Sequence, residues 1–143
     1  MIVPLTPRHW RQRETGSAFA VNAGIETLDV ALLSGAPETV HTPSASGVGQ
    51  KIVRCPECRV ALLSHYPQLG ALLAFVRVGT LDMPSLCPPD AHIFTSTRQS
   101  WFELPAGAPR FDEFYEAADR AALYGEDGAA RLGALIAMKR AAG

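Results

Sequence analysis

Two cysteines three positions apart carry the strongest chemical signal in the sequence. Cys55-Pro56-Glu57-Cys58 has a spacing at which a tight turn directs both sulfurs toward one tetrahedral metal ion. Arg54 and Arg59 flank the pair, and their positive charges favour the thiolate forms that a metal needs. A structural zinc ion takes four ligands, so the motif supplies half of a zinc site.

Two other interpretations of this pair stay open, namely a redox-active dithiol and a pair of thiols that binds no metal. A redox pair usually opens a helix beside a strand–helix–strand unit, whereas Cys58 leads into the strand-like segment Arg59-Val60-Ala61-Leu62-Leu63. The context therefore favours zinc.

The remaining metal-binding side chains are scattered. Cys87 lies in a proline-rich loop, where it is either a third ligand or, as is more common for a lone cysteine, an apolar filler. The four histidines are His9, His41, His65 and His92, and no two of them stand four residues apart. His92 lies in a strand pattern and is expected to be a hydrogen-bonded core residue.

Composition excludes several classes of protein. The 143 residues carry 13 basic and 14 acidic side chains without a basic stripe, which argues against nucleic-acid binding. No apolar run reaches the ~20 residues that span a bilayer, so no membrane insertion is expected. The start shows no apolar core of a secretory signal, and three cysteines cannot all pair, so we expect reduced thiols in the cytoplasm.

The elements that must position these residues fall into three stretches. Residues 1–17 are basic and aperiodic and are expected to form a loose N-terminal arm. Residues 18–110 hold short segments rich in Val, Ile, Leu and Phe between glycine and proline turns, which predicts a mainly β domain. The expected strand segments are 18–25, 27–33, 50–55, 59–66, 71–81 and 91–96, and Ser46-Gly47-Val48-Gly49 is expected to be a hairpin loop.

The last stretch, residues 111–143, changes to helical spacing. Apolar residues recur at three- and four-residue intervals, acidic residues crowd the beginning, and Lys139 and Arg140 lie near the end. This pattern predicts a helical extension over 111–140 that packs on the β domain. Gly125 and Gly128 are expected to divide it into two helices.

The order of several fragments resembles the glutathione-dependent formaldehyde-activating enzyme family, which includes the centromere protein V domain. The matching fragments are Gln12-Arg13-Glu14-Thr15-Gly16-Ser17-Ala18-Phe19, Leu33-Ser34-Gly35, Arg54-Cys55-Pro56-Glu57-Cys58, Val78-Gly79-Thr80-Leu81-Asp82, Pro89-Asp90-Ala91-His92-Ile93-Phe94, Trp101 and Leu104-Pro105. The resemblance implies a β-tent zinc fold of two small antiparallel sheets. It also implies a zinc-dependent carbon–sulfur lyase that acts on thiol adducts such as S-hydroxymethylglutathione.

The sequence departs from the family at its metal ligands. Cys55 and Cys58 match two structural zinc ligands, but the early Cys-x-Cys pair that completes that site does not precede them. The three cysteines that hold the catalytic zinc in the family fall on Thr6, Arg8 and Arg11, none of which is a thiolate. Arginine has no lone pair to offer and opposes a cation. The family also has glycine where Arg59 stands, so we expect a looser turn after Cys58.

Two function classes follow. One is a lyase whose ligands lie outside the recognised positions, and the other is a non-catalytic member that keeps the fold as a binding or dimerisation module. In the second case, Cys55 and Cys58 would meet their counterparts in a homodimer and share a zinc ion across the twofold axis. Thr15, Gly16 and Ser17 follow the lost cysteines and either bind a thiol substrate such as glutathione or form the turn that opens the first strand.

Overall fold

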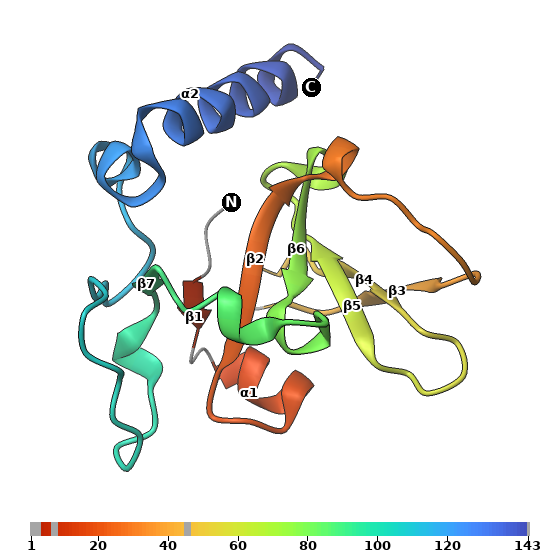
Figure 1. Ribbon diagram of the computed structural model, residues 1–143, viewed down its shortest axis with the longest axis horizontal. Coiled ribbons are helices and arrows are strands. Elements are labelled where there is room, and N and C mark those ends of the chain that lie inside the picture. The colour runs from red at the N-terminus through yellow and green to blue at the C-terminus, as the bar shows by residue number, and fades with distance from the viewer. Residues whose placement is uncertain (1–3, 7–8, 45–46, 143) are drawn as a thin grey trace.

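A mainly antiparallel sheet forms the body of the protein in the computed structural model, which describes residues 4–6, 9–44 and 47–142. The strands are β1 (Pro4–Thr6), β2 (Ala20–Glu26), β3 (Glu38–Thr42), β4 (Gln50–Arg54), β5 (Ala61–His65), β6 (Leu73–Arg77) and β7 (Ala91–His92), and the helices are α1 (His9–Thr15) and α2 (Arg120–Ala141). Short 3₁₀ turns join several of these elements (Figure 1). The expected fold class, mainly β with a C-terminal helix, is confirmed.

The strands of the described residues follow the order β3-β4-β5-β6-β2-β1-β7. Every pairing is antiparallel except that of β1 with β7. β2 belongs to both halves of the sheet, because its first residues pair with β1 and its later residues with β6. The loop between β3 and β4 joins antiparallel neighbours, which confirms the hairpin. The β-tent arrangement around zinc remains an expectation from the resemblance.

The two faces of the sheet have different chemistry. Strand alternation places Asn22, Gln50, Ser64 and Arg77 on one face, and all four are buried. The opposite face carries Ala23, which packs with Val78 in an apolar cluster. One face is thus built to hold polar groups away from water.

Several predicted elements differ from the structure. Residues 1–17 are not a loose arm throughout, because α1 occupies His9–Thr15 and buries Arg11. Residues 27–33 are no strand: a 3₁₀ turn at Thr27–Asp29 leads into an exposed segment that includes Leu32 and Leu33. β3 is not predicted from the sequence, because its polar composition hides it.

The predicted helix begins later than its periodicity suggests. Residues 111–116 form no helix, and the backbone of residues 111–113 bonds the 92–96 segment, as in the bond from Phe111 N–H to the His92 carbonyl at 2.8 Å. The aromatic spacing there serves a cluster around Ile93 and Tyr115 instead. Gly125 does interrupt α2, with φ +70° and ψ 166°, as expected, whereas Gly128 does not.

α2 touches the sheet lightly. None of its residues is buried, and Arg131 bonds Glu26 at 2.6 Å and Asp29 at 3.0 Å. Figure 1 shows α2 across one end of the sheet, beyond β2 and β6, and not along a face. No helix in the described ranges has the length and apolar character needed to span a bilayer.

Candidate functional site

The Cys55–Cys58 turn leaves the end of β4 and returns into β5. Two backbone hydrogen bonds close it, from Cys55 N–H to the Val60 carbonyl at 3.0 Å and from Arg59 N–H to the Cys55 carbonyl at 3.1 Å. Arg59 has φ +63°, the left-handed conformation that glycine adopts most easily. The turn is thus closed by two hydrogen bonds with an arginine in place of the glycine, and its looseness relative to other family members stays a prediction.

The turn also favours ionisation of the Cys55 thiol. The backbone N–H of Cys58, then that of Glu57, and then the Cys58 thiol lower the pKa of the Cys55 thiol below its usual range. The flanking arginines instead engage a carboxylate: Arg54 donates to Glu38 at 2.8 Å, and Arg59 pairs with the same group. Backbone donors, rather than the basic neighbours expected from the sequence, favour the thiolate.

Cys55 and Cys58 place two thiols on one turn. Cys58 is exposed and Cys55 half-buried, so the pair faces solvent at the end of a hairpin. In the described part of the chain, no three His, Cys, Asp or Glu side chains are grouped to hold a metal. Cys87 packs beside Ala23 and Val78, as the apolar-filler interpretation predicts.

Arg11, which the resemblance aligns with the third catalytic cysteine of the family, is a buried cation. Arg11 on α1 is 8% exposed, and its guanidinium lies 4.7 Å from the centre of the Tyr66 ring and 3.5 Å from Glu14. At the two other positions, Thr6 lies in β1 and Arg8 outside the described residues. A buried guanidinium does not fit a catalytic zinc, because it brings positive charge and no ligand atom.

Glu14 is the centre of the polar network beneath α1. It pairs with Arg77 and accepts a hydrogen bond from the Gln50 amide at 2.9 Å. Arg77 in turn bonds Asn22 and donates to the Ser64 hydroxyl at 3.2 Å. Burial lowers the pKa of Arg77 from its usual value, and the Glu14 carboxylate opposes that shift. The network thus holds buried charge by pairing and hydrogen bonding.

Polar atoms at the border of this network lack a partner among the described residues. They are Gln50 Oε1, the Tyr66 hydroxyl and Arg77 Nε. Gln50 and Tyr66 also line a cavity of about 290 Å³, together with His65 and Lys51. Buried polar groups usually find a partner, so this border has room for water or a small ligand.

The Thr15-Gly16-Ser17 segment has the geometry of a turn. The Thr15 hydroxyl donates to the Arg11 carbonyl at 2.8 Å, Ser17 N–H donates to the Thr15 hydroxyl at 3.3 Å, and Gly16 has φ +65°. These bonds end α1 and lead toward β2. All three residues are exposed, and contact with a substrate stays a prediction.

His92 is a core residue, as expected. It is fully buried, and its Nε2 donates to the Pro105 carbonyl at 3.1 Å because a carbonyl can only accept. Nδ1 has no partner among the described residues. Burial lowers the pKa of His92 from its usual range, and the nearby Arg110 adds to that effect.

A comparison with protein families matches residues 9–97 to the glutathione-dependent formaldehyde-activating enzyme family. The chain belongs to this family. A comparison with curated proteins finds no match. Membership and geometry together show a family domain in which Cys55 and Cys58 share one closed turn and an arginine–glutamate network lies beneath α1.

The sequence pattern does not predict the partners of that network. Glu14 stands in a fragment that matches the family, and Arg77, Asn22 and Ser64 belong to no recognised motif. One signal was available: Arg77 interrupts the apolar run of residues 71–78, and a charge inside a buried strand needs a partner.

Proposed function

We propose that this chain is a non-catalytic member of its family that works as a binding and dimerisation module. The observation that carries the proposal is the buried Arg11, which bonds Glu14 at the position of a catalytic cysteine. Zinc catalysis needs three protein ligands and an open coordination position. Lyase action on S-hydroxymethylglutathione, the activity implied by the family, would need ligands from elsewhere.

The ligand of the module is proposed to be a small thiol adduct of the glutathione type. Thr15, Gly16 and Ser17 are the proposed contact residues, because they keep the family sequence and are exposed beside the network. The Ser17 hydroxyl and the backbone of the turn offer hydrogen bonds to a peptide-like molecule.

The dimer is proposed to form around one zinc ion shared by Cys55 and Cys58 of two chains. The closed turn, the lowered pKa of Cys55 and the exposure of Cys58 support this arrangement. Two such pairs make the four-thiolate cage that structural zinc prefers, and a twofold axis lets identical surfaces supply it.

Exchange NMR with formaldehyde and glutathione tests the loss of catalysis. The purified chain is expected to leave the rate of S-hydroxymethylglutathione formation at its uncatalysed value. A rate increase that depends on the protein and disappears with a chelator would refute the proposal.

Elemental analysis with light scattering tests the shared zinc. We expect one zinc per two chains and a dimer that dissociates when a chelator is added. Cys58→Ser should abolish both, whereas Cys87→Ser, a cysteine within the apolar cluster, should leave both unchanged. One zinc held tightly by each monomer would contradict the shared site.

A further inference from the structure

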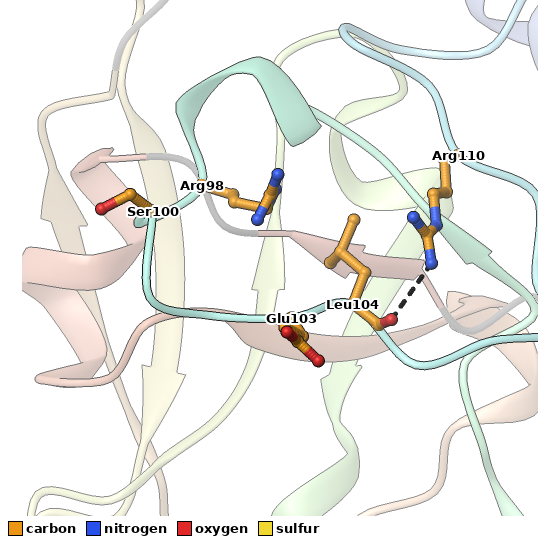
Figure 2. A pocket seen from close by; sticks show the side chains of 5 residues that line it. All are labelled: Arg98, Ser100, Glu103, Leu104 and Arg110. Carbon is orange, nitrogen blue, oxygen red and sulfur yellow. Dashed lines mark hydrogen bonds between the residues drawn. The ribbon is translucent and has the colours of Figure 1, made fainter.

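A pocket in the C-terminal loop holds two arginines that face the same space. It has a volume of about 350 Å³ and is lined by Arg98, Ser100, Glu103, Leu104 and Arg110. All five residues lie beyond the 9–97 segment that matches the family. Figure 2 shows the Leu104 side chain between the two guanidinium groups and the Glu103 carboxylate on the other side of the loop.

Both guanidinium groups are held by the backbone of the same loop. Arg98 donates to the Phe102 carbonyl at 2.8 Å, and Arg110 donates to the Leu104 carbonyl at 3.1 Å. Neither has an acidic partner within 4 Å in the described residues. Each guanidinium has five N–H donors in a planar fork, so most of its donors remain available to a ligand.

The loop itself is anchored to the region of α1. The Gln99 amide donates to the Gln12 side chain at 2.8 Å, and the rings of Phe19 and Phe102 stack with their centres 4.7 Å apart. The anchored loop and the hydrogen bonds of the two arginines to its carbonyls thus place two positively charged forks on either side of an apolar side chain. Such preorganisation lowers the cost of binding.

We propose that this pocket binds a small molecule with two carboxylates joined by a short apolar linker. Each carboxylate meets one guanidinium, for which a two-oxygen acceptor is the matching shape. The linker lies against Leu104, which is 9% exposed and forms the apolar part of the pocket. A molecule with only one carboxylate engages one guanidinium group and leaves the other without an acidic partner.

Titration of the full chain with glutarate and with butyrate tests the proposal, because the two molecules differ by one carboxylate. Glutarate should shift the side-chain Nε–H NMR signals of both Arg98 and Arg110 and bind at least about tenfold more tightly than butyrate, as the loss of one charge-assisted pair implies. Added salt should weaken glutarate binding.

Single substitutions test how much each of the two guanidinium groups contributes to glutarate affinity. Arg98→Gln and Arg110→Gln should each reduce glutarate affinity about tenfold and bring it close to that of butyrate. Arg140→Gln, which removes an exposed arginine of α2, should change neither affinity. The signals of the wild-type chain provide a readout that does not depend on how any variant folds.

Equal affinity for glutarate and butyrate would overturn the proposal, as would unchanged signals of both arginines. These outcomes are independent of the proposed module function, because neither zinc nor a thiol takes part in the titration.

Discussion

Two regions of this protein, both matched to metal ligands by the family resemblance, are built differently. Beneath α1, Arg11 and Glu14 form a largely buried charged network that reaches Arg77 and Gln50. At the Cys55–Cys58 turn, two backbone hydrogen bonds close a turn that carries two thiols at the surface. An interior site must be filled by groups that satisfy one another, whereas water can complete a site at the surface.

The largest expected effect on stability comes from substitution of Glu14. Glu14→Gln removes the negative charge that compensates Arg77, so we expect the free energy of unfolding to fall by about 3 kcal/mol. Urea denaturation measures this change in the free energy of unfolding. The control Glu103→Gln, at an exposed residue, should change the free energy by less than about 0.5 kcal/mol. Equal effects of the two changes would show that the network contributes little to stability.

Restoring one cysteine should not restore a metal site. Arg11→Cys removes the contacts with Tyr66 and Glu14, and we expect a loss of about 1–2 kcal/mol of stability with no added zinc per chain. Arg13→Cys places the same thiol on the exposed side of α1 and should cost less than about 0.5 kcal/mol. Additional tightly bound zinc in the Arg11→Cys chain alone would mean that the network is not a barrier to metal binding.

An effect of intermediate size on the free energy of unfolding is expected from the buried His92 side chain. The folded-state pKa of His92 is lowered, so the unfolded chain takes up a proton at higher pH than the folded chain does. The free energy of unfolding should therefore fall as pH decreases below about 6.5, by at most about 1.4 kcal/mol per pH unit. Unfolding measured between pH 7.5 and 5.5 should show this slope, and His92→Asn should reduce it. An unchanged slope in the variant would assign the pH dependence to other groups.

The smallest expected effect is at the surface turn. Arg59→Gly relieves the positive φ and loses an exposed ion pair with Glu38, so stability should rise by no more than about 1 kcal/mol. Arg59→Ala loses the same pair but keeps the strained conformation and should be less stable than the glycine variant. Thermal denaturation compares them, and equal stability would show that the turn carries no strain.

The sequence predicted features that are local in the chain. Turn-bounded apolar runs identified most of the strands, and the Cys-x-x-Cys spacing identified the turn at Cys55. It could not predict that the backbone of residues 111–113 bonds the 92–96 segment, because aromatic residues at helical spacing also suit a non-helical segment over a core cluster. Glu14 and Arg77 are 63 positions apart, and nothing in the local pattern indicates that they meet.

The light attachment of α2 has a consequence for local motion. The ion pairs of Arg131 are exposed, and solvent-exposed pairs of this kind contribute little to stability. Leu123 and Tyr124 pack against the cluster of Ile93 and Tyr115 and hold the first turn of α2, whereas the part of α2 beyond Gly125 can detach from the sheet far more often than the whole protein unfolds. The amide hydrogens of this part of α2 should exchange with solvent through this opening, while those of β2 and β6 should exchange only on global unfolding.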